Sequence, residues 1–100
     1  MDGTWEIKAP NGESHRIKFL TPNFAIFIDS DIANPSVFLV NTYQIPNRDS
    51  EIVTITQVEH GYTACYIASR KSNSPDKNEY FGRWVDVTGK EGGFTFAKIT

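Results

Sequence analysis

Apolar residues in this chain recur at alternate positions, and turn-forming residues interrupt them about every 8 to 15 residues. In the segment 51–58, for example, Ile52, Val53 and Ile55 are interleaved with threonines. A two-residue period places successive side chains on opposite faces of a β-strand, whereas a helix needs apolar residues three and four positions apart. No long segment keeps that helical spacing. The pattern therefore predicts an all-β fold.

Eight segments combine this alternation with the β-branched and aromatic residues that strands favour. They are 4–9, 14–21, 24–30, 37–45, 51–58, 62–69, 79–87 and 93–99. Short links favour antiparallel neighbours, because parallel strands need long crossover connections. We therefore expect one domain over residues 1–100, with about eight antiparallel strands in an up-and-down meander that forms a small barrel or half-barrel.

Size and charge narrow the classes of function. The chain has 100 residues, of which 39% are hydrophobic, and this composition suits a single globular domain. Its net charge is −2, so it has no basic surplus for binding nucleic acid. Its longest apolar run, 24–28, is far shorter than the ~20 residues of a membrane-spanning helix. We therefore expect neither a nucleic-acid partner nor a membrane span.

The chain has one cysteine, Cys65, which excludes an intramolecular disulfide and a cysteine-rich zinc site. Its place within the strand 62–69 favours a buried, inert thiol. A lone cysteine suits a reducing compartment. We expect a cytoplasmic protein if Met1 is the native start, and an exported one if a leader has been removed.

Side chains with catalytic or metal-binding chemistry are few and scattered. His15 and His60 are the only histidines, and because their spacing is not that of metal ligands, we expect both at the surface. His60 is close to Cys65 in the sequence, but a nucleophilic cysteine needs a positioned base. Asp29 and Asp31 are interpreted as solvating a loop. We therefore expect no enzymatic activity, no metal and no cofactor.

Two consecutive strands are apolar on both faces. The segment 24–30 begins Phe-Ala-Ile-Phe-Ile, and 37–45 begins Val-Phe-Leu-Val. A small sheet buried on one side should alternate apolar and polar residues, so a loop or a partner subunit must cover the second face. The candidate interface residues are Phe27, Phe38 and Val40. This leaves open an alternative function, that of a structural or assembly protein that forms a homodimer.

Gly3-Thr4-Trp5, at the head of the first strand, resembles the Gly-x-Trp signature of lipocalin-like (calycin) barrels. The segment 80–96 also looks like the last hairpin of small bacterial lipocalin-like domains, and the middle of the chain carries no such likeness. The resemblance implies an up-and-down barrel whose tryptophan closes one end and which holds an apolar ligand or a protein partner. Compact calycins usually carry a disulfide, and this chain departs from that pattern.

Aromatic residues are the candidates for lining such a ligand pocket. They are Tyr43, Tyr62, Tyr66, Trp84, Phe94 and Phe96. Alternatively, they fill a solid core, because an eight-stranded barrel is only wide enough for side chains or one small ligand. The sequence thus favours a non-enzymatic binding module of lipocalin-like type.

Overall fold

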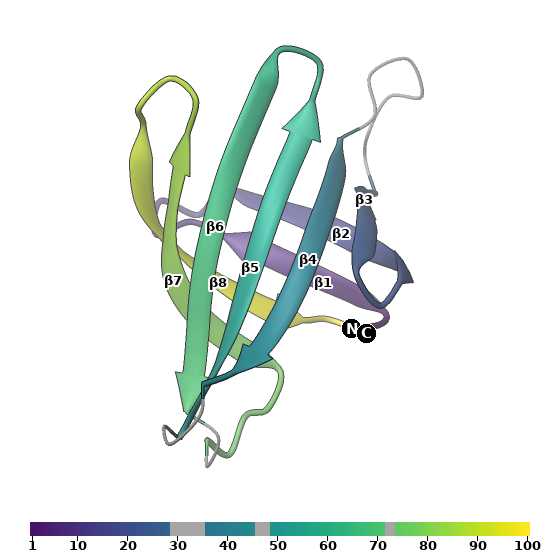
Figure 1. The fold of residues 1–100 in the computed structure, drawn as a ribbon, viewed down its shortest axis with the longest axis vertical. Coiled ribbons are helices and arrows are strands. Elements are labelled where there is room, and N and C mark those ends of the chain that lie inside the picture. The colour runs from purple at the N-terminus through teal and green to yellow at the C-terminus, as the bar shows by residue number, and fades with distance from the viewer. Residues whose placement is uncertain (29–35, 46–48, 72–73) are drawn as a thin grey trace.

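The computed structural model describes residues 1–28, 36–45, 49–71 and 74–100, which form a closed antiparallel barrel of eight strands (Figure 1). Each strand pairs with the next along the chain, and β8 returns to pair with β1. Closure of this kind removes the unpaired sheet edges that invite aggregation. The predicted all-β fold and antiparallel meander are confirmed, and the barrel is closed.

The strands lie close to the predicted segments. They are β1 (Thr4–Lys8), β2 (Ser14–Thr21), β3 (Phe24–Phe27), β4 (Val37–Gln44), β5 (Ser50–Glu59), β6 (Tyr62–Lys71), β7 (Glu79–Asp86) and β8 (Glu91–Lys98). β5 and β6 are longer than predicted because they pair without interruption as far as Ser50 and Lys71. The predicted strand 24–30 is too long, since β3 ends at Phe27, and residues 29 and 30 lie outside the described part of the chain.

Alternate side chains along each strand point inward, and these side chains fill most of the barrel interior. In β4, for example, Phe38 and Val40 are 0% and 1% exposed, whereas Leu39 between them is 47% exposed. All eight strands contribute to this core. Its buried hydrophobic members are Trp5, Ile7, Ile17, Phe19, Ala25, Phe38, Val40, Val53, Ile55, Ala64, Tyr66, Ala68, Tyr80, Phe94 and Phe96.

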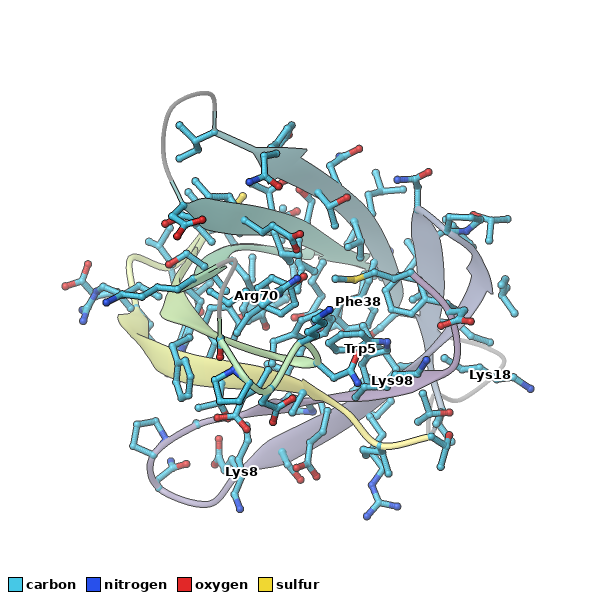
Figure 2. The ribbon with its side chains drawn as sticks, turned by 90° about the horizontal axis from the view of Figure 1, so that it is seen from below. Trp5, Lys8, Lys18, Phe38, Arg70 and Lys98 are labelled. Carbon is cyan, nitrogen blue, oxygen red and sulfur yellow. The ribbon has the colours of Figure 1, made fainter. Side chains whose placement is uncertain are left out.

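Trp5 is buried at the end of the barrel that holds the two termini, which lie side by side in Figure 1. Its ring stacks on Phe96 with 4.5 Å between centroids, and its indole nitrogen donates a 2.8 Å hydrogen bond to the carbonyl of Asp2. Figure 2, seen from below, shows Trp5 and Phe38 inside the ring of strands. Buried aromatic contacts of this kind add to the free energy gained from burial alone.

The backbone at position 3, two residues before Trp5, requires a glycine. Its φ is +77°, and a Cβ at this position would lie 2.1 Å from the carbonyl oxygen of Thr100. The amide of Thr4 donates a 3.0 Å hydrogen bond to the same oxygen, so the chain ends are held together. Only a residue without a side chain satisfies both the backbone conformation and the close approach.

The predicted interface on β3 and β4 needs correction. Phe38 and Val40 face the barrel core, and Phe27 packs against that core from its partly buried position, so these three residues do not form an outer surface. The second apolar face of the two strands is made by the residues between them. Those residues are Phe24 and Ile26 of β3, and Val37 and Leu39 of β4, which pair as Phe24–Leu39 and Ile26–Val37.

Candidate ligand-binding site

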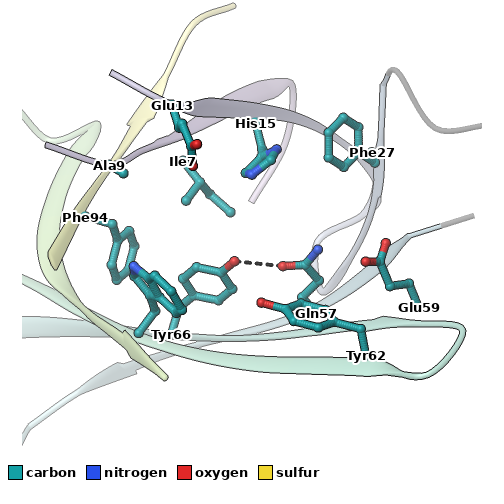
Figure 3. A pocket seen from close by; sticks show the side chains of 11 residues that line it. Ile7, Ala9, Glu13, His15, Phe27, Gln57, Glu59, Tyr62, Tyr66 and Phe94 are labelled. Atoms are coloured by element: carbon teal, nitrogen blue, oxygen red, sulfur yellow. Dashed lines mark hydrogen bonds between the residues drawn. The ribbon is translucent and has the colours of Figure 1, made fainter. Parts of the chain in front are cut away.

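A cavity of about 300 Å³ lies at the end of the barrel away from Trp5 (Figure 3). It is surrounded by the ends of β1, β3, β5 and β7 and by the beginnings of the strands that follow β1, β5 and β7. The described residues that line it are Ile7, Ala9, Glu13, His15, Phe27, Gln57, Glu59, Tyr62, Tyr66, Trp84 and Phe94. Three of the core residues described above, Ile7, Tyr66 and Phe94, form the boundary between the filled interior and this cavity, which makes this the hollow end of the barrel.

A hydrogen bond between two buried side chains forms the floor of the cavity. The hydroxyl of Tyr66 donates to Oε1 of Gln57 over 2.7 Å, and each residue is 6% exposed (Figure 3). Burial raises the pKa of the Tyr66 phenol, which keeps it protonated and able to donate. The bond also leaves the amide nitrogen of Gln57 facing the cavity in Figure 3. The floor is therefore polar at one defined point.

Aromatic rings make up much of the cavity wall. Tyr66 meets Phe94 edge to face at 5.2 Å between centroids and lies 6.4 Å from the ring of Trp84. In another part of the lining, His15 and Phe27 meet edge to face at 5.2 Å. Each ring is thus supported by a neighbour, and such packing limits the rearrangement that ligand binding requires.

The charged residues that line the cavity are carboxylates. Glu13 immediately precedes β2 and Glu59 ends β5, where the hydroxyl of Ser36 donates a hydrogen bond to Oε2 of Glu59. No lysine or arginine is among the described residues that line the cavity. At neutral pH these two side chains therefore contribute negative charge to the lining of the cavity.

Asp86 is a third acid close to the cavity, held by several donors at the β7–β8 turn. One of its carboxylate oxygens accepts hydrogen bonds from the hydroxyl and amide of Thr88 and from the amide of Lys90. The other accepts a 3.1 Å hydrogen bond from the hydroxyl of Tyr62, a lining residue. These bonds, that of the Thr88 hydroxyl first, hold the pKa of Asp86 below its ordinary value. Burial, then Asp86 and Glu59, raise the pKa of Tyr62.

Four of the six aromatic residues predicted to line a pocket do line this cavity: Tyr62, Tyr66, Trp84 and Phe94. Phe96 does not, because it is fully buried against Trp5 near the closed end. Tyr43 does not line the cavity either, because it points outward like Leu39 and is 51% exposed. Its hydroxyl lies 3.4 Å from the hydroxyl of Thr54. Phe96 and Tyr43 therefore lie outside this cavity.

The polar lining was missed at the sequence level, although the sequence holds a signal for part of it. The inward phase of β5 runs Val53, Ile55, Gln57, Glu59, so two polar residues continue an apolar series on one face. Polar residues in core-facing positions often mark a site or a solvent-filled opening. His15 carries a similar signal, because it continues the inward phase of Ile17 and Phe19 in β2.

The other residues considered for catalysis or metal binding are Cys65, His60, Asp29 and Asp31. Cys65 is exposed and not buried as predicted, because the inward phase of β6 belongs to Ala64 and Tyr66. His60 is exposed at the β5–β6 turn. The predictions for Asp29 and Asp31 lie outside the described residues. Among the residues that are described, no group of three or more histidine, cysteine, aspartate or glutamate side chains is arranged to hold a metal ion.

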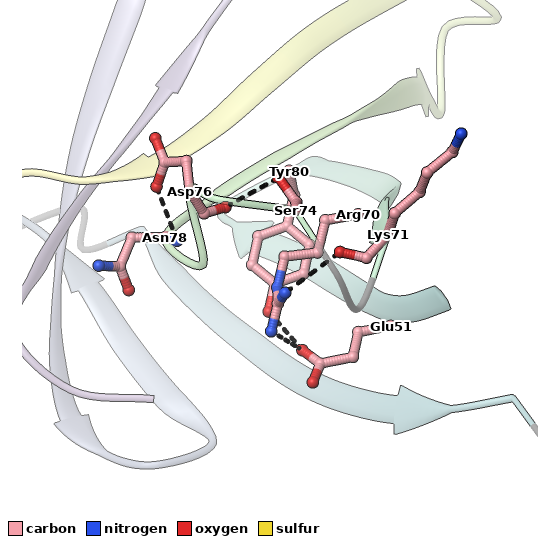
Figure 4. Close-up of polar contacts among 7 residues, drawn as sticks. All are labelled: Glu51, Arg70, Lys71, Ser74, Asp76, Asn78 and Tyr80. Carbon is pink, nitrogen blue, oxygen red and sulfur yellow. Dashed lines mark hydrogen bonds and ion pairs between the residues drawn. The ribbon is translucent and has the colours of Figure 1, made fainter. Parts of the chain in front are cut away.

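A polar cluster lies near the end of the barrel opposite the cavity, around Arg70 (Figure 4). The guanidinium of Arg70 forms a 2.7 Å ion pair with Glu51 and lies 5.6 Å from the centre of the Tyr80 ring. The hydroxyl of Tyr80 donates a 3.1 Å hydrogen bond to the same Glu51 oxygen. Because the charges are matched within the cluster, we interpret it as a structural element of the barrel.

No helix in the described part of the chain is long and apolar enough to cross a membrane. The eight-stranded antiparallel barrel, with a buried tryptophan at the end that holds the termini, is consistent with a calycin-like barrel. Comparison with known protein families, with curated proteins and with solved structures finds no match.

Proposed function

We propose that this protein is a non-enzymatic binding module of lipocalin-like type that holds a small ligand with an apolar body. One observation carries the proposal: a cavity walled by aromatic side chains lies at the hollow end of an otherwise filled barrel. Binding pockets of folded proteins are usually largely apolar, with a few polar groups that fix orientation. The Tyr66–Gln57 pair supplies such a group at the floor.

The cavity volume limits the ligand. Its value of about 300 Å³ is at the lower end of the range for small-molecule sites, ~300 to 1,000 Å³. Trp5, Phe38 and Phe96 fill the barrel beyond it, so a long acyl chain has no room to extend along the axis. We therefore propose a ligand with about one ring or a short branched chain.

A titration of the folded chain by two-dimensional NMR tests this function. The probes are single-ring compounds of different charge: tert-butylbenzene, indole, benzoate and phenyltrimethylammonium. The two tryptophans give separate indole signals. Since Trp84 lines the cavity and Trp5 is buried at the other end, a bound probe is expected to shift the Trp84 signal and leave that of Trp5 in place. If no probe shifts the Trp84 signal at millimolar concentration, the proposal is wrong.

A matched pair of variants checks the position of the site by calorimetry. Trp84→Leu removes an aromatic wall of the cavity, whereas Phe81→Leu makes a similar change on the same strand at a residue that is 56% exposed. Affinity for any probe that binds is expected to fall about tenfold or more in Trp84→Leu and to stay within about twofold in Phe81→Leu. Equal effects of the two changes would contradict the proposed location.

A second candidate function is self-association, as a structural or assembly protein. It is favoured by the outward apolar face of β3 and β4, where Phe24 pairs with Leu39 and Ile26 with Val37. Sedimentation of the chain tests it, with Leu39→Lys as the disrupting variant and Ile67→Lys as the control. Both positions are exposed, at 47% and 59%, but Ile67 lies on β6. A wild-type chain that sediments as a monomer at all concentrations would remove this candidate.

A further inference from the structure

Two properties of the cavity bear on the charge of the ligand that it can hold. Among the described residues that line it, Glu13 and Glu59 are the carboxylates and His15 is the one basic side chain. The hydroxyl of Ser36 fixes one oxygen of Glu59, which limits the freedom of this carboxylate to turn away. Asp86, which accepts a hydrogen bond from the lining residue Tyr62, places a third negative charge close to the cavity. A negative potential in a recess with low-dielectric walls concentrates cations and repels anions.

The second property is the density of aromatic faces. Phe27, Tyr62, Tyr66, Trp84 and Phe94 all line the same cavity. The face of an aromatic ring carries partial negative charge, and it attracts a cation within about 6 Å of its centre, tryptophan most strongly. Each such contact contributes about 0.5 to 2 kcal/mol, depending on how far the cation is removed from water.

The type of cation follows from these donors. Calcium and magnesium ions need six or more oxygen ligands, and among the described residues no cluster of acidic, histidine or cysteine side chains supplies a metal site. Aromatic rings suit instead a weakly hydrated cation whose charged atom carries carbon substituents. The same rings accept the apolar part of the molecule by burial.

On the basis of the binding function proposed above, we infer that the cavity binds an organic ammonium ion. Its positive charge is attracted by the carboxylates of Glu13 and Glu59, and its apolar groups pack against the aromatic walls that include Trp84 and Tyr66. The amide nitrogen of Gln57 faces the same space and gives the ligand one donor to bind through an oxygen or nitrogen acceptor (Figure 3).

Two probes that differ in one atom test the charge preference. Phenyltrimethylammonium and tert-butylbenzene have the same shape, but the first has a positively charged nitrogen where the second has a carbon. Each is titrated into the folded chain, and the indole signals of Trp84 and Trp5 are followed by NMR. The cation is expected to shift the Trp84 signal alone and to bind about tenfold more tightly than the hydrocarbon, measured up to the solubility limit of the latter.

Three variants connect the preference to the carboxylates. Glu13→Gln and Glu59→Gln keep the size of the side chain and remove its charge, and each is expected to weaken cation binding about threefold or more. The matched control is Glu91→Gln, because Glu91 lies near the same end of the barrel but is exposed, with Arg83 at 3.8 Å. This control is expected to bind the cation with wild-type affinity, and none of the three variants should change hydrocarbon binding.

The outcomes separate this inference from the function on which it rests. If the hydrocarbon binds as tightly as the cation, or if neither cavity variant weakens cation binding, the inference is wrong and the binding function stands. If neither these two probes nor indole nor benzoate shifts the Trp84 signal, both are wrong. Weaker cation binding in the two cavity variants with unchanged binding in Glu91→Gln supports the inference.

Discussion

Tyr66 donates a hydrogen bond to Gln57 across the β5–β6 hairpin, and the two side chains are the most deeply buried polar pair at the cavity. This hydrogen-bonded pair affects both the stability of the barrel and the properties of the cavity. It fills the centre of the barrel just below the cavity, and it also sets the polarity of the cavity floor. Changing one partner and changing both therefore have different consequences.

Tyr66→Phe removes the donor and leaves the buried carbonyl oxygen of Gln57 without its partner. We expect a loss of about 1 to 2 kcal/mol in the free energy of unfolding, measured by urea denaturation, because an unsatisfied buried acceptor costs more than an average hydrogen bond contributes. The double variant Tyr66→Phe with Gln57→Leu should recover part of the loss, since no polar group is then left unpaired. A double variant less stable than the two single losses combined would contradict this account.

Gly82 is the position where the barrel wall leaves no space for a side chain. A Cβ there would lie 1.8 Å from the carbonyl oxygen of Ile67 and 2.6 Å from Cα of Ala68, both backbone atoms that cannot move independently. We expect Gly82→Ala to lower the free energy of unfolding by about 3 kcal/mol or more, or to prevent folding. Its control, Gly93→Ala, places a Cβ no closer than 3.7 Å to Gly82 and should cost less than about 1 kcal/mol. Similar losses for the two variants would argue against the close approach.

Arg70 is expected to contribute to stability through both its charge and its planar shape. Its side chain is 10% exposed, pairs with Glu51 and lies against the ring of Tyr80. Arg70→Met should lower the free energy of unfolding by about 2 kcal/mol, because Glu51 then keeps a partly buried charge without its cationic partner. In the background of Glu51→Gln, the same change should cost less. A double-mutant cycle by thermal or urea unfolding measures the difference, and additive effects would mean that the pair is not coupled.

The β7–β8 turn is expected to loosen in acid. Hydrogen bonds from Thr88 and Lys90 lower the pKa of Asp86 from its ordinary value of 3.8. The folded form therefore holds its proton less tightly than the unfolded form, and the contribution of Asp86 to stability is present above about pH 4 and is lost as the pH falls through the lowered pKa. Amide signals of Thr88 and Lys90 should shift together in this range.

Asp86→Asn provides the control for this titration, because it keeps the side-chain shape without an ionisable group. The two amide signals should then no longer respond to pH below about 4. Persistence of the same response in Asp86→Asn would assign it to another carboxylate. Asp2 also has a lowered pKa, caused chiefly by its hydrogen bond with Lys98, but it lies at the other end of the barrel and would not act on these amides.

The strands and their antiparallel order could be predicted from the sequence, because alternating apolar residues and turn residues act within single hairpins. Alternation and turns give β2, β5 and β6 their positions, and short turns make neighbours antiparallel. The phase of β4 could not be read in this way, because Val37 to Val40 are all apolar. Closure of the barrel decides it, placing Phe38 inside and Tyr43 outside. The cavity depends on closure even more, since Ile7 and His15 face Gln57 and Tyr66 across it only when β8 pairs with β1.

The exposed thiol of Cys65 has a practical consequence for every measurement of self-association. Because this is the single cysteine of the chain, any disulfide that air oxidation forms between two copies joins them through the outer face of β6. Such a pair would sediment as a dimer whatever the apolar face of β3 and β4 does. The same thiol is also a single attachment point for a spectroscopic label, and it lies on the outside of the wall whose inner surface carries Tyr66.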